Sequence, residues 1–212
     1  MKKQQKNLRG TAVEGMKGLL SDLGGIARRP LDGVNSGMNS IKLALDGGKS
    51  KAPLVGILMG SASDHDVMKG VAEVLDEMKV TWELDIASAH RMPDKVAAYA
   101  KAARERGVEV LICGAGMAAH LAGAVAANTT LPVIGVPLAS GALGGEDALW
   151  STVQMPPGIP VATVAIGGAK NAAFLACQIL SIKHPGLADR LDRHRADQRA
   201  ALEKKAEELR KK

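Results

Sequence analysis

From Pro53 onward, short apolar runs alternate with amphipathic segments. Five runs have the length of strands: Leu54–Met59, Thr81–Ile86, Val108–Cys113, Val133–Val136 and Val161–Ile166. All but the second are almost entirely apolar, which is typical of strands buried on both faces of a sheet. Between Val67 and Met78, apolar residues recur every three or four positions, and this period predicts a helix. Further helices are expected over Pro93–Arg106, Ala118–Asn128 and Ala169–Ser181.

Strands that alternate with helices over short connections predict a parallel sheet with right-handed crossovers. We therefore expect residues 53–184 to form an α/β domain, a three-layer sandwich around about five parallel strands. Residues 185–212 predict a long polar helix with a thin apolar stripe, suited to packing on a neighbouring subunit: Leu187, Leu191 and Leu202. Residues 1–52, rich in glycine and polar residues, predict a flexible N-terminal extension with at most one short helix between Val13 and Leu23.

The formal net charge of +6 comes from the two ends of the chain. Residues 1–52 hold ten Lys or Arg against four Asp or Glu, and residues 183–212 hold ten against six. The body between them, with 8 basic and 12 acidic residues, is net negative. A nucleic-acid-binding domain would carry its basic face on the body, and the 2% aromatic content leaves few platforms for stacking bases. We therefore expect no nucleic-acid partner.

Neither a metal site nor a membrane segment is indicated. Cys113 and Cys177 lack CxxC or Cys/His spacing, and both are expected to be reduced core residues. No run approaches the roughly 18 apolar residues that span a bilayer, and the basic start MKKQQKNLRG lacks the apolar core of a secretory signal. We expect a cytoplasmic protein with no membrane partner.

Chemically reactive residues gather directly after the first four predicted strands. In open α/β sheets, ligands bind outside the carboxyl ends of the strands, where the strand order reverses. The four segments that follow these strands are 60–64 (GSASD), 88–94 (SAHRMPD), 114–120 (GAGMAAH) and 139–145 (ASGALGG). Loops elsewhere in the chain are plain, so this asymmetry predicts a ligand site at one edge of the sheet.

Two of these segments carry polar groups suited to a phosphorylated sugar. Segment 60–64 offers backbone N–H groups and two hydroxyls before a helix, suited to a phosphate or a sugar, and Asp64 fits a ribose hydroxyl better than a phosphate. The alternative is that Ser63 or Asp64 only caps the helix. His90 can act as a general acid or base near neutral pH, and Arg91 offers a planar fork for phosphate. The alternative here is a hydrogen-bonded loop histidine beside a surface arginine.

The third segment matches a dinucleotide fingerprint only superficially. Gly114–Ala119 reads GxGxxA, but no acidic residue follows about 20 positions later, and the motif stands in the third crossover instead of the first. A phospho-receiver domain is excluded as well, because the first strand does not end in an acidic pair. The small residues could instead line a compact, dry pocket. His120 follows on the expected helix, and we interpret it as a structural residue and not as part of the site.

Taken together, these segments closely resemble the N5-carboxyaminoimidazole ribonucleotide mutase family of purine biosynthesis. The resemblance covers about residues 53–185 and rests on five ordered motifs, namely MGSASD (59–64), SAHRMPD (88–94), GAGMAAHLAG (114–123), VIGVP (133–137) and QMPPGIP (154–160). The family pattern commonly has Thr where Met92 stands and Gly where Met117 stands. Neither departure removes a reactive group, although Met117 could narrow the pocket.

The resemblance implies a flavodoxin-like, doubly wound sheet and a homo-octamer with sites at subunit junctions. It implies conversion of the N5-carbamate of aminoimidazole ribonucleotide into its C4-carboxylate isomer, without metal, nucleotide or biotin as cofactor. By the same resemblance His90 is the general acid and base. The substrate-binding residues carried over are Ser61, Ser63, Asp64 and Arg91 for the ribonucleotide, and Ser88, Gly114, Ala115 and Gly116 beside the ring and the carboxylate.

Three other hypotheses remain. A sister class carboxylates aminoimidazole ribonucleotide directly with CO2, but it typically has Lys at the position of Arg91 and lacks the pair Pro93-Asp94, so the sequence favours the mutase. A non-catalytic sensor of a nucleoside monophosphate would need Arg91 but not His90. A basic scaffold would depend on residues 1–52 and 183–212 instead.

Overall fold

A computed structural model describes residues 52–211, so the predicted N-terminal extension and its short helix lie outside the described residues. Within this part of the chain, all strands belong to one parallel sheet: β1 (Val55–Met59), β2 (Trp82–Ile86), β3 (Val110–Gly116), β4 (Val133–Leu138) and β5 (Ala162–Thr163). The strand order is β2-β1-β3-β4-β5. The direction of winding therefore reverses between β1 and β3, as in flavodoxin-like folds.

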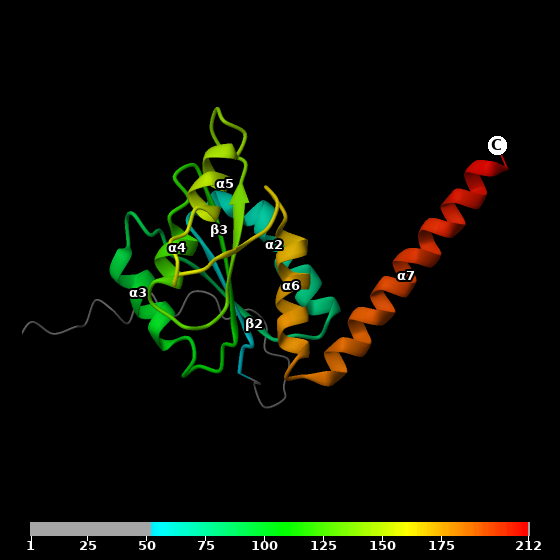
Figure 1. The fold of residues 1–212 in the computed structure, drawn as a ribbon, viewed down its shortest axis with the longest axis horizontal. Helices are drawn as coiled ribbons and strands as arrows, with labels where there is room; N and C mark the ends of the chain where they lie inside the picture. Colours follow the sequence, from blue (N-terminus) through cyan, green and yellow to red (C-terminus); the bar gives the residue numbers. More distant parts are fainter. Residues whose placement is uncertain (1–51, 212) are drawn as a thin grey trace, which may run out of the picture. The chain divides into compact units, whose positions relative to one another are not determined.

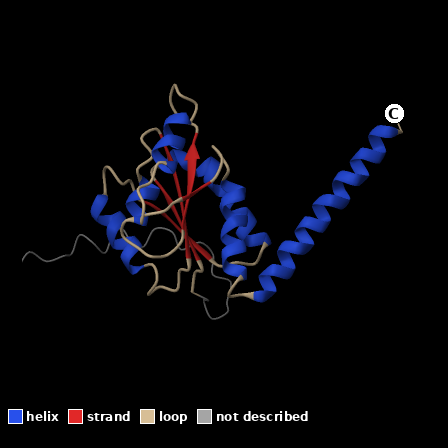
Figure 2. Cartoon of the chain, in the orientation of Figure 1, coloured by secondary structure: helices blue, strands red, loops and turns tan. Residues whose placement is uncertain are grey.

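Helices cover both faces of the sheet, which gives the predicted three layers (Figure 1, Figure 2). One face carries α2 (His65–Glu77) and α6 (Ala169–Ser181), and the other carries α3 (Pro93–Ala102) and α4 (Leu121–Ala126). Side chains alternate between the two cores along β1 and β3, as pleating requires. Ile57 faces α2 and α6, whereas its neighbour Leu58 faces α3 and α4. The three-layer α/β fold is confirmed.

Two elements differ from the sequence prediction. The last strand spans Ala162–Thr163 alone and lies at the edge of the sheet. Helix α5 (Glu146–Val153) was not predicted, because only Ala148 and Thr152 of its residues are buried and so thin a stripe gives no helical period. It packs on the same face as α4, since a side chain in place of Gly135 would collide with Thr152.

The long C-terminal helix α7 (Pro185–Arg210) begins against the chain's own core. Leu187 and Leu191 are buried in the same cluster as α2 and α6. The Nε of Arg190 donates to the carbonyl of Met78 at 2.7 Å. The interpretation that this whole stripe packs on a neighbouring subunit is therefore wrong for these two leucines, which bury apolar surface within the chain. Leu202 remains 68% exposed, so for it the prediction stands untested.

Candidate active site

The predicted site segments meet where β1 and β3 end, because parallel strands place their carboxyl ends at one edge. The backbone N–H of Gly60 donates to the carbonyl of Gly114 at 3.1 Å, which extends the pairing of β1 with β3 beyond the end of β1. On the other side of β1, the N–H of Ala87 donates to the carbonyl of Met59 at 2.8 Å. The segments after β1, β2 and β3 are thus held side by side at the switch point.

The segment after β1 forms a compact polar turn. Ser61 caps the short 3-10 helix η2 (Ala62–Asp64), and its own N–H donates to Oδ2 of Asp64 at 2.9 Å. Ser63 donates from its hydroxyl to Oγ of Ser61 at 2.9 Å. The capping alternative is therefore correct in part: Asp64 stands at the N-cap of α2 without a side-chain cap bond there, and its side chain instead completes a capping box with Ser61, the N-cap of η2. The three polar side chains form one cluster.

Asp64 is less readily ionised than an ordinary aspartate. Partial burial raises the pKa of its carboxyl, and this outweighs the opposing effects of hydrogen bonds from the Ser61 backbone, the Ser63 hydroxyl and the Gly60 backbone and of the Arg91 charge. A carboxyl that is already hydrogen-bonded and partly desolvated is suited to binding a neutral hydroxyl. This environment agrees with the expected contact to a ribose hydroxyl.

Arg91 links the segment after β2 to the segment after β1. Its Nη2 donates to the carbonyl of Gly60 at 3.2 Å, and its Nε donates to Oγ of Ser88 at 3.3 Å. The backbone N–H of Arg91 also donates to Oγ of Ser88 at 3.3 Å. The hydroxyl of buried Ser88 therefore orients the guanidinium. Arg91 itself is exposed, so the rest of its fork is accessible to an anion.

His90 faces His120 across the site. The two rings lie 5.1 Å apart, centroid to centroid, with their planes inclined by 41°. Both residues are exposed. His120 is therefore no core histidine, because the turn before α4 brings it to the surface, and its interpretation as structural stays a prediction. In this turn, Ala119 donates to the carbonyl of Met117 at 2.8 Å and His120 to that of Ala118 at 2.7 Å.

Gly114, Ala115 and Gly116 are the last three residues of β3. Their small size has a packing reason: a side chain at Gly114 would collide with Met68 of α2, and one at Gly116 would collide with the hydroxyl of Ser140. Ser140 follows β4 and belongs to the fourth predicted site segment, 139–145, but the sequence does not predict it as a site residue. Gly116 is the sequence signal that could have indicated this contact, because a glycine at the end of a strand often makes room for a neighbouring group.

The described residues contain no group of three or more His, Cys, Asp or Glu side chains placed to hold a metal ion. Cys113 and Cys177 are free and buried, as expected. Burial raises the pKa of the Cys113 thiol far above its ordinary value and that of Cys177 to about 11, so neither is a ready nucleophile.

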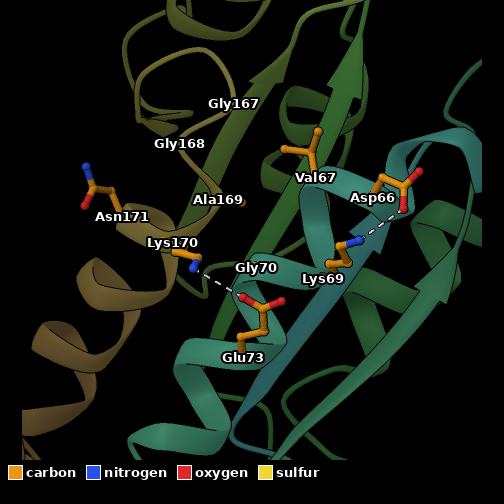
Figure 3. Close-up of a pocket in the computed structure, with 10 residues that line it drawn as sticks. All are labelled: Asp66, Val67, Lys69, Gly70, Glu73, Gly167, Gly168, Ala169, Lys170 and Asn171. Carbon is orange, nitrogen blue, oxygen red and sulfur yellow. Dashed lines mark hydrogen bonds and ion pairs between the residues drawn. The ribbon is translucent and has the colours of Figure 1, made fainter.

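A surface pocket of about 420 Å³ lies between α2 and the start of α6 (Figure 3). It is lined by Lys69 and Lys170, but each is already paired with a carboxylate, Lys69 with Asp66 at 3.2 Å and Lys170 with Glu73 at 3.3 Å. None of the predicted site residues lines this pocket. The predicted site residues lie instead in the segments that follow the strands.

The fold and the site define a class: a flavodoxin-like α/β protein with an exposed arginine, a hydroxyl cluster and two imidazoles at the switch point. The AIR carboxylase family model matches residues 54–201. The chain belongs to this family.

Named relatives agree. The chain is 57% identical to the N5-carboxyaminoimidazole ribonucleotide mutase of Pyrococcus horikoshii, over 76% of this chain and 91% of that protein. It is 51% identical to the phosphoribosylaminoimidazole carboxylase of Schizosaccharomyces pombe, over 76% of this chain and 29% of that longer protein. A crystal structure of Treponema denticola PurE superposes with a TM-score of 0.66 at 29% identity, over 74% of this chain and 98% of that one.

Among the described residues, no helix combines the length and apolar character that crossing a membrane requires.

Proposed function

We propose that this chain converts N5-carboxyaminoimidazole ribonucleotide into 4-carboxy-5-aminoimidazole ribonucleotide, a step of purine biosynthesis, as an isomerase. The names of its relatives support the reaction. The observation that carries the proposal is the link from Arg91 to Gly60 and Ser88, because it gathers an anion-binding arginine, the Ser61–Asp64 cluster and His90 around one position. A ribonucleotide substrate needs a partner for its phosphate and its ribose hydroxyls, and the reaction needs a group that can give and take a proton.

In this proposal the ribonucleotide is bound mainly through the segments after β1 and β2. Arg91 binds the phosphate through the part of its fork that does not contact the chain. Asp64 accepts from a ribose hydroxyl, and Ser61 and Ser63 supply further hydrogen bonds. Gly114, Ala115 and Gly116 border the ring, with Ser88 holding Arg91 in place. Because β3 ends in residues without bulky side chains, a flat heterocycle can lie close to its backbone.

His90 then moves one proton in each direction. It donates a proton to the carbamate nitrogen, the N–C bond breaks, and CO2 leaves a ring whose C4 is nucleophilic. C4 attacks the retained CO2, a C–C bond forms, and the proton on C4 returns to His90. One imidazole suffices because the proton count balances over the cycle. Small residues beside the ring keep CO2 close to C4 and exclude water.

The assembly belongs to the same proposal. We place the chain in a homo-octamer with sites at the subunit junctions. Large apolar side chains that the single chain leaves exposed support burial in such an assembly, among them Met117, Leu143, Trp150 and Val153. Light scattering tests the octamer. Localisation in the cytoplasm also stays a prediction.

The test is to supply the carbamate ribonucleotide without ATP, in buffer containing labelled bicarbonate, and to follow the C4-carboxylate. The mutase forms product that carries little label, because the substrate's own CO2 is transferred. A direct carboxylase would instead use aminoimidazole ribonucleotide and incorporate the label. A sensor would bind without turnover. Either of the last two results would overturn the proposal.

A further inference from the structure

Ser140 lies directly over the end of the neighbouring strand. In the sheet register, Gly116 of β3 stands beside Leu138 of β4, and Ser140 follows two residues later. Its hydroxyl occupies the space that a side chain at Gly116 would fill, and the residue is half-buried. Gly116 therefore has to be a glycine while Ser140 adopts this position.

The hydroxyl of Ser140 differs from those of the other serines in the described residues. Ser61, Ser63, Ser88, Ser151 and Ser181 each use the side-chain oxygen in a hydrogen bond within the chain. Ser140 has no such bond to any described residue, although it is only partly exposed to water. A half-buried hydroxyl without a partner in the protein is available to a ligand.

Its position relates it to the site described above. Gly114 and Gly116 stand two positions apart and so lie on the same side of β3, and Gly114 is the residue whose carbonyl accepts from Gly60. Two strand spacings, about 10 Å, separate the end of β1 from the end of β4, which is comparable with the length of a ribonucleotide. A substrate whose phosphate lies at Arg91 would therefore bring the far side of its ring towards Ser140.

We infer that the Ser140 hydroxyl donates a hydrogen bond to the carboxylate that the reaction moves onto C4. This inference rests on the proposed function. The group it recognises is a planar, anionic carboxylate, which accepts hydrogen bonds readily. Because Gly116 has no side chain, the Ser140 hydroxyl can lie against the backbone at the end of β3. Ser140 is therefore a substrate-binding residue that contacts ribonucleotides carrying the C4-carboxylate and not those that lack it.

The test compares the affinities of two ribonucleotides, the C4-carboxylate and aminoimidazole ribonucleotide, which lacks the carboxylate. Ser140→Ala should weaken binding of the carboxylate about tenfold or more, as loss of a hydrogen bond to a charged group does. Binding of aminoimidazole ribonucleotide should change less than about twofold. The matched control is Ser151→Ala, whose hydroxyl donates to Asp147 within α5; it should change neither affinity.

Equal losses for both ribonucleotides, or no loss for either, would overturn the assignment of Ser140. If the wild type binds neither ribonucleotide, the proposed function itself fails, which is a separate result. A second variant guards against misfolding: Ser140→Cys keeps a side chain of similar shape but is only a weak donor, so it should give the same selective loss. A loss in Ser140→Cys that is equal for both ribonucleotides would contradict the inference.

Discussion

At the scale of single residues, the site is held by contacts that the chain makes with itself. Ser88 is buried, and its hydroxyl accepts from both the backbone and the side chain of Arg91. Because the guanidinium is oriented before any ligand arrives, little conformational entropy remains to be lost on binding. Arg91 is therefore expected to contribute strongly to affinity.

Arg91→Ala should weaken ribonucleotide binding by about 1.5–3 kcal/mol, or roughly 10–150-fold, because a charge-assisted contact to phosphate is lost. The measurement is the dissociation constant of the ribonucleotide and of its dephosphorylated nucleoside. The nucleoside should bind wild type and variant alike. An undiminished penalty with the nucleoside would show that Arg91 does not bind the phosphate.

Met117 carries backbone strain at the end of β3. Its φ of 55° lies in the left-handed region, which glycine adopts freely and other residues at a cost. Its side chain is 59% exposed, so little burial offsets this cost. The mutase family commonly has glycine at this position, and the positive φ explains that preference.

Met117→Gly should therefore leave the free energy of unfolding unchanged or raise it by up to about 1 kcal/mol. Met117→Val should lower it by about 1 kcal/mol or more, because a β-branched residue tolerates this backbone conformation least. Denaturant titrations at one protein concentration provide the comparison. A valine variant more stable than the glycine variant would contradict the strain at this residue.

At the scale of elements, the buried strands were the most predictable part of the chain. The first four predicted strands are confirmed, with shifts at their ends, because their apolar runs leave few alternatives. The helix expected from Ala118 begins only at Leu121, since the preceding residues form two tight turns that no periodicity reveals. For the same reason the sequence could place His90 in a site but not His120 opposite it. The position of the Ser140 side chain depends on how the segment after β4 folds back. No pattern within that segment predicts how it folds.

A polar cluster fixes the junction between α6 and α7 to the start of β3. Oε1 of Glu109 accepts from Nζ of Lys183 at 2.7 Å, and Nε2 of His184 lies 3.0 Å from its Oε2. Partial burial alone would raise the pKa of Glu109, but these hydrogen bonds and charges outweigh it and hold the pKa below its ordinary value. A carboxyl whose pKa is lower in the folded state stabilises the fold above its unfolded pKa of about 4.3 and loses this contribution as the pH falls further.

Glu109→Gln should lower the free energy of unfolding at pH 7 by up to about 1 kcal/mol, because Lys183 is largely exposed and His184 is only half-buried. The difference between wild type and variant should shrink as the pH falls from about 5 towards 3. Unfolding curves over this pH range measure it. A difference that is constant with pH would show that the charge of Glu109 plays no part.

At the scale of the whole molecule, the α/β domain carries every residue assigned to the site. All of them lie at or beyond Ser61, and the family model begins at residue 54. A chain that begins at Ala52 should therefore keep its turnover number. The comparison needs turnover and light scattering on both chains. Loss of most activity with fold and assembly intact would assign residues 1–51 a part in the chemistry.

The central claim is that His90 transfers the proton in a mutase reaction, and one paired measurement tests it most directly. Turnover of the carbamate ribonucleotide and affinity for the ribonucleotide are measured on wild type and His90→Asn. Asparagine is similar in size but cannot exchange a proton. We therefore expect turnover to fall by at least about 10²-fold while affinity changes far less. Near-normal turnover in His90→Asn would contradict the account.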